Sequence, residues 1–151
     1  FRERIIIVAN SRGLPRSVKT EGDIAGTLWY YDEYEYNGEE LIKRTTTNNA
    51  STSPAIFFFE WKNGNPVKTT FSNLGQTILM KYDESIPHQP GDYHHRLLLT
   101  RGFEEMRPKN ALIKNGNETY SYSFDSDGKI IGLTASNTPN PYTATYQYLC
   151  N

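Results

Sequence analysis

The chain of 151 residues has little of what defines several protein classes. Its one cysteine, Cys150, cannot close an intrachain disulfide, so a disulfide scaffold is excluded. The longest apolar runs, residues 5–9, 55–59 and 97–99, fall far below the roughly 20 residues of a membrane-spanning helix. Neither sign of charge dominates, because 16 Lys and Arg oppose 17 Asp and Glu. A nucleic-acid partner is therefore not expected.

Helical patterns are also scarce. The only helical piece that we predict is residues 103–106, which Gly102 and Pro108 limit to about one turn. Aromatic residues, at 13% of the chain, instead recur at every second position just before a turn dipeptide. Such spacing is typical of β-strands.

Asn-Gly and Asp-Gly dipeptides follow the aromatic pairs and predict hairpin turns, because they tolerate the positive φ angles of type I′ turns. They occur at residues 37–38, 63–64, 115–116 and 127–128. Polar loops are expected at residues 45–54, 85–92 and 136–141, and a strand at residues 97–99. The sequence predicts one all-β domain over residues 1–151: an antiparallel meander of about ten strands with hairpin repeats, forming a strongly curled sheet or a small barrel.

Alternation sorts the side chains of each strand onto two faces. In the strand before Asn37, one face carries tyrosines for packing, whereas the other combines aromatic rings with carboxylates. Rings next to acidic acceptors suit a sugar, which stacks on the ring and bonds through its hydroxyls. Two other interpretations need no ligand: the strand is covered by other parts of the chain on both faces, or a bulge near Asp32 shifts the register and buries Trp29. The candidate ligand-binding residues are Trp29, Tyr31, Glu33, Glu35 and Phe58.

Two clusters raise the question of a metal ion. His88, His94 and His95 lie close in sequence, but adjacent histidines of an extended segment point to opposite faces, so a polar loop is the simpler interpretation. Asp125 and Asp127 imitate a calcium loop that lacks its distal Glu, and a hairpin turn explains them. We expect no metal site and no cofactor.

Motifs for catalysis are missing. The sequence has no G-x-S-x-G element, no phosphate-binding glycine loop and no carboxylate pair placed in an evident cleft. We therefore expect no catalytic residues and no enzyme. One alternative stays open: a weak enzyme acting on envelope polymers, whose catalytic residues come together only in the folded chain.

The turn-and-strand motifs at residues 34–38, 61–65 and 120–128, with the closing strand at residues 146–150, resemble a known family. It is the family of Bacteroidetes lipoprotein domains of unknown function, common in gut Bacteroides and described as having a porin-like fold. More distantly, the motifs are similar to tyrosine-aspartate repeats of bacterial surface proteins. The resemblance implies secretion, a lipidated cysteine in the precursor and attachment at the outer membrane. It supplies no catalytic residues.

The expected function is that of a non-enzymatic surface or periplasmic module that binds a glycan or another envelope component. The alternative is a structural or assembly module that binds a protein partner. The chain begins at Phe1 on a strand pattern, and we expect a targeting segment to have been removed. Neither nucleic acid nor a membrane-spanning helix is expected.

Overall fold

The computed structural model describes residues 4–22, 29–51 and 53–148. Within them, eleven strands form one sheet, and a single helix follows the seventh strand. The predicted all-β antiparallel meander is confirmed, with eleven strands in place of about ten. The elements are β1 (Arg4–Ala9), β2 (Pro15–Glu21), β3 (Trp29–Asn37), β4 (Glu40–Asn48), β5 (Ala55–Lys62), β6 (Asn65–Phe71), β7 (Gln76–Pro87), α1 (Tyr93–Arg101), β8 (Asn110–Asn115), β9 (Glu118–Phe124), β10 (Ile130–Ser136) and β11 (Tyr142–Thr145).

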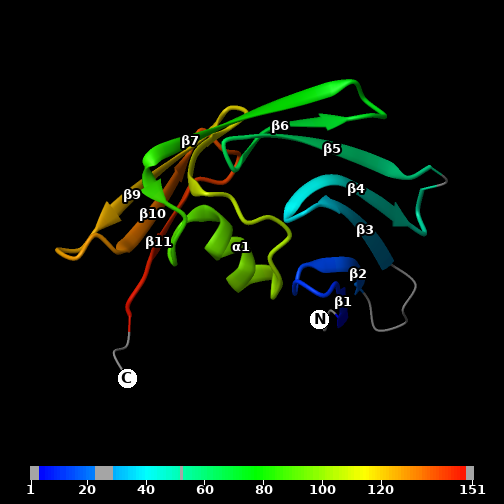
Figure 1. Ribbon diagram of the computed structural model, residues 1–151, viewed down its shortest axis with the longest axis horizontal. Helices are drawn as coiled ribbons and strands as arrows, with labels where there is room; N and C mark the ends of the chain where they lie inside the picture. Colours follow the sequence, from blue (N-terminus) through cyan, green and yellow to red (C-terminus); the bar gives the residue numbers. More distant parts are fainter. Residues whose placement is uncertain (1–3, 23–28, 52, 149–151) are drawn as a thin grey trace.

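Each strand pairs with its neighbours in sequence, and β1 and β11 form the two edges. The sheet arches over α1, which lies in its hollow (Figure 1). The 12-residue β7 joins the two parts of the arch, because its first four residues pair with β6 and the strand from Met80 onward pairs with β8. No helix in the described ranges is long and apolar enough to cross a membrane.

The predicted hairpin turns are found at all four dipeptides. Asn63 and Gly64 both have positive φ, 53° and 78°, as a type I′ turn requires. At the other three dipeptides, the glycine has a positive φ. Strands extend further than expected in three places, since residues 45–48 belong to β4, residues 85–87 to β7 and residue 136 to β10. Their threonines and isoleucine suit an extended backbone.

The inner face of the arch carries the core, which has two parts. In the first, buried residues of β2 to β5 pack against Met106, from the chain after α1; they are Val18, Tyr34, Leu41 and Phe59. In the second, Met80 packs with residues of β8 to β10, namely Leu112, Tyr120, Leu133 and Ala135. Five half-buried tyrosines surround this second part: Tyr82, Tyr93, Tyr122, Tyr142 and Tyr146. Alternation therefore identified most of the packed aromatic residues, although Phe124 is 41% exposed.

The helix was predicted in the wrong place. Residues 97–99 lie inside α1 and not in a strand, whereas residues 103–106 form no helix. The physical reason is capping at both ends. The Asp92 side chain accepts the backbone N–H of His95 at the N-terminus, and Gly102, at φ 77°, donates its N–H to the Leu98 carbonyl.

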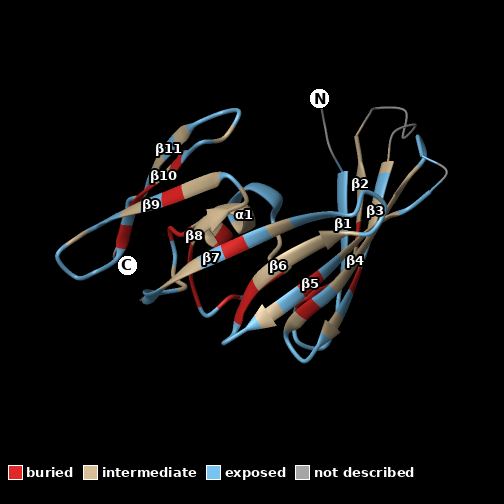
Figure 2. Ribbon diagram, turned by 90° about the horizontal axis from the view of Figure 1, so that it is seen from above, coloured by how far each residue is buried: buried red, intermediate tan, exposed pale blue. Residues whose placement is uncertain are grey.

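The edge strand β1 is exposed along its whole length (Figure 2). Its four aliphatic residues expose between 37% and 49% of their surface, although they point alternately to both faces. At the opposite end of the chain, Cys150 lies outside the described residues.

Candidate functional site

The predicted aromatic and acidic residues of β3 share the outer face of the arch. The β3 register runs without a shift from Trp29 to Glu35, so no bulge near Asp32 reburies Trp29. Glu33 and Glu35 are exposed, whereas Trp29 and Tyr31 are half-buried.

Phe58 lies on the same outer face but at the other end of β3. It pairs with Lys43, which in turn pairs with Glu35 and forms an ion pair with it at 2.6 Å. Trp29 is six residues from Glu35 along the strand, or about 20 Å. The five predicted residues are therefore spread over a convex surface, and Phe58 is 44% exposed at one end of it.

A cavity of about 400 Å³ lies on the inner face, between β1 to β5 and the C-terminal end of α1. We call it the trough. Its walls carry four aromatic rings: Tyr30 and Tyr34 of β3, Phe57 of β5, and Phe103 just after α1. Tyr30 is 47% exposed, while Tyr34 belongs to the buried core. A volume of this size suits a small ligand such as a short saccharide.

Polar groups alternate with these rings along the trough. Asp32 lies between Tyr30 and Tyr34 on β3, and its carboxylate accepts a hydrogen bond from the Thr46 hydroxyl. Thr20 of β2 and Thr100 of α1 add further hydroxyls. The trough therefore offers aromatic faces together with donors and acceptors for hydroxyl groups.

Arg44 and Arg101 stand where the trough meets a second cavity of about 380 Å³. Both guanidinium groups face Glu105: Arg44 Nη1 lies 3.3 Å from Oε2, and Arg101 Nη1 lies 3.7 Å from Oε1. The Arg44 guanidinium also lies over the Phe57 ring, 4.3 Å from its centroid. Two cations thus share one carboxylate at this point.

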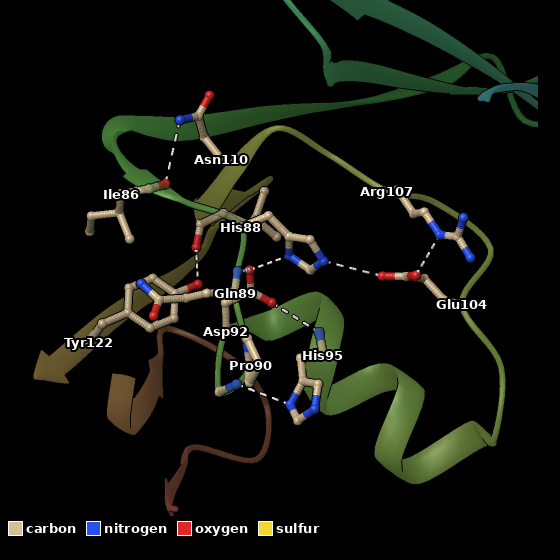
Figure 3. Close-up of polar contacts among 12 residues, drawn as sticks. Ile86, His88, Gln89, Pro90, Asp92, His95, Glu104, Arg107, Asn110 and Tyr122 are labelled. Atoms are coloured by element: carbon tan, nitrogen blue, oxygen red, sulfur yellow. Dashed lines mark hydrogen bonds and ion pairs between the residues drawn. The ribbon is translucent and has the colours of Figure 1, made fainter. Parts of the chain in front are cut away.

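The histidine loop forms a polar cluster at the other end of α1 (Figure 3). His88 Nδ1 lies 2.5 Å from Asp92 Oδ2, and its Nε2 lies 3.3 Å from Glu104 Oε1. Arg107 Nε donates to the second oxygen of Glu104 at 2.9 Å. Since Asp92 also caps α1, His88 connects the start of the helix to the chain that follows its end. We call these four residues the His88 cluster.

Protonation states follow from these contacts. Burial alone would lower the pKa of His88, but its hydrogen bonds to Asp92 and Glu104 raise it to about 9. His94 is buried beside the rings of Tyr82 and Tyr93, and burial lowers its pKa to about 4. The two histidines therefore carry different charges at neutral pH, with His88 protonated and His94 neutral.

The structure does not gather these histidines around a point where a metal ion would sit. No group of three or more His, Cys, Asp or Glu suited to a metal occurs in the described part of the chain. His95 Nδ1 accepts the backbone N–H of Gly91. The Asp125 carboxylate accepts two backbone N–H groups of its own turn, those of Asp127 and Lys129, as a hairpin turn requires.

Several trough residues escaped the sequence analysis. Tyr30 was assigned to the packed face of β3, and Asp32 was considered only as the place of a bulge, because alternation separates two faces without saying which one is hollow. Arg101 and Phe103 were out of reach for a second reason, since the helix that positions them was not predicted. The available signal was the pair of caps at Asp92 and Gly102.

Comparisons with known proteins supply no family and no curated relative: no family model matches the chain, and no curated protein matches it.

Proposed function

We propose that this domain is a non-enzymatic binding module that acts outside the cytoplasm and binds a glycan, or another envelope component with sugar-like chemistry, in the trough. The observation that carries the proposal is Tyr30, an exposed ring inside a concave site beside the Asp32 carboxylate. A sugar ring stacks its C–H face on an aromatic ring while its hydroxyls bond to the carboxylate. In this proposal, the curl of the sheet over α1 is what makes the site concave.

The resemblance to Bacteroidetes lipoprotein domains supports the location. We propose attachment at the outer membrane through a lipidated precursor cysteine, or residence in the periplasm. We also propose that the domain is not an enzyme, because the acidic groups at the trough already have partners within the domain. The Glu105 carboxylate faces two guanidinium groups, and the Asp32 carboxylate accepts a hydrogen bond from the Thr46 hydroxyl.

The test compares adjacent residues of β3 that point to opposite faces. A glycan array identifies ligands for the purified domain, and calorimetry then measures their affinity for the Tyr30→Ala and Tyr31→Ala variants. We expect Tyr30→Ala to weaken binding roughly tenfold or more, as for a central aromatic contact, and Tyr31→Ala to leave it unchanged. Circular dichroism of both variants confirms that the fold is intact.

The same experiment tests the outer face. If Tyr31→Ala or Trp29→Ala removes binding while Tyr30→Ala does not, the ligand lies on the convex surface of Trp29, Tyr31, Glu33, Glu35 and Phe58. If the wild-type domain binds no glycan on the array, the proposed function is wrong.

A second candidate function is an assembly module, and the observation that favours it is β1. Among the described residues, no strand pairs with the outer side of β1, and the aliphatic side chains of β1 are exposed on both faces. The candidate partner is a second copy of this chain, whose β1 would continue the sheet by antiparallel pairing.

A further inference from the structure

We propose that the ligand of the trough is an acidic saccharide, whose carboxylate binds to the guanidinium of Arg101 next to that of Arg44. This inference rests on the proposed function, because it specifies the chemical class of the glycan. Among the described residues, Arg44 and Arg101 are the two cationic side chains that line the trough.

The positions of the two arginines are set by the fold. Arg44 lies on the inner face of β4 and pairs with Tyr34 on one side and Phe57 on the other. Arg101 is the last residue of α1, immediately before the Gly102 cap. The sheet and the helix therefore bring two guanidinium groups from distant parts of the sequence to the same end of the trough.

Arg44 and Arg101, at one end of the trough, carry two positive charges and more hydrogen-bond donors than the Glu105 carboxylate that both of them face can accept. Glu105 is the one acidic partner of both groups among the described residues. Its distance to Arg101 Nη1, 3.7 Å, is an ion pair without a hydrogen bond, and the Arg101 side chain is 46% exposed. Arg44 Nε is buried without a hydrogen-bond partner in the described structure. Arg101 is thus free to turn its donors toward a second carboxylate.

The geometry favours a carboxylate on a sugar rather than a small inorganic anion. Guanidinium groups bind carboxylates through two parallel hydrogen bonds, and Arg44 is oriented by stacking on Phe57. Tyr30 and Tyr34 are four residues apart, so the exposed ring lies about 13 Å along β3 from the row of Arg44. A ligand that uses both ends is longer than one sugar ring, with neutral hydroxyls near Asp32 and its acid group near Arg101.

The experiment uses oligosaccharides of galacturonic, glucuronic and mannuronic acid, each paired with its methyl ester. The ester keeps the ring and the hydroxyls but removes the negative charge. Calorimetry of the wild-type domain is expected to show at least about tenfold tighter binding of one acid than of its ester. The preference should shrink as salt is added, because exposed charges are screened.

Two variants and a matched control locate the charge effect. Arg101→Gln should abolish the preference for the acid while leaving ester binding within about twofold. Arg44→Lys keeps the charge but replaces the planar group, and should reduce the preference severalfold. Lys43→Gln is the control, because Lys43 is the β4 neighbour of Arg44 on the opposite face and also pairs with a glutamate. It should leave the preference unchanged.

The outcomes separate this inference from the function on which it rests. If acids and esters bind equally and Tyr30→Ala removes both, a glycan binds in the trough but the acidic ligand is wrong. An equal loss in Lys43→Gln and Arg101→Gln would overturn the inference as well, because it would indicate general charge attraction. If neither these acids and esters nor any glycan on the array binds, both proposals fail.

Discussion

Raising the pH should remove the stabilisation that the protonated His88 ring gives to the fold. In the folded state its pKa is about 9, compared with 6.5 for a free histidine, because Asp92 and Glu104 stabilise the protonated ring. A raised pKa means that the folded state binds the proton more tightly than the unfolded state does. The stabilisation is therefore complete below pH 6.5 and disappears as the pH rises through 9.

The size of the effect follows from the shift in pKa. A difference of about 2.5 units corresponds to about 3 kcal/mol of unfolding free energy, at 1.36 kcal/mol for each unit. The His88 side chain is 24% exposed, so solvent screens the interaction only in part. His94, whose pKa is lowered to about 4, stays neutral throughout the range above pH 7 and does not contribute there.

Urea unfolding between pH 6 and 10 measures this effect, with His88→Gln as the reference variant. Other groups titrate in both proteins, so the informative quantity is the difference in unfolding free energy between wild type and variant. We expect that difference to fall by about 3 kcal/mol across the range. NMR titration of the imidazole gives the pKa directly. A difference that stays constant with pH, or a His88 pKa near 6.5, would refute the charged His88 cluster.

Two further predictions concern the backbone and the edge of the sheet. Gly91→Ala should lower the unfolding free energy, measured in urea, by roughly 2 kcal/mol. The reason is that Gly91 has a φ of 96° and that an added Cβ would lie 2.7 Å from the Ile130 carbonyl oxygen. An unchanged stability would contradict this packing. Ile6→Lys should abolish self-association in sedimentation experiments at rising concentration, because it places a charge on the exposed β1 edge; a wild type that stays monomeric would exclude the assembly function.

The strands were predictable because local signals and the final sheet agree. Aromatic residues at every second position and turns such as Asn63-Gly64 specify hairpins without long-range information. The helix was not predicted, because three consecutive leucines, residues 97–99, resemble a strand and show no helical spacing. Leu99 is 61% exposed in α1, so the apolar run does not mark a buried stripe.

The candidate site shows the limit of alternation more clearly. Tyr30 and Tyr31 differ only in the face to which they point, and the sequence contains no local signal for the direction in which the sheet bends. That direction depends on where α1 packs, and the helix follows β7, far from β3 in the sequence. The outer face, with its rings and carboxylates, was the natural choice from sequence, whereas the hollow depends on long-range contacts.

The meander order has a consequence for how the chain reaches its structure and how its length can vary. Every strand pairs with the previous one, and most of the connections are short; the long exception is residues 88–109, between β7 and β8. Closing a pair across a short connection costs little loop entropy, so folding can begin at any of several hairpins and spread to both sides. A hairpin gained or lost at the β11 edge leaves the order of the remaining pairs unchanged. The insertion between β7 and β8 is different, because it carries α1, which lies in the hollow beneath the arch. Related chains can therefore be expected to differ in the number of edge strands while retaining the helix.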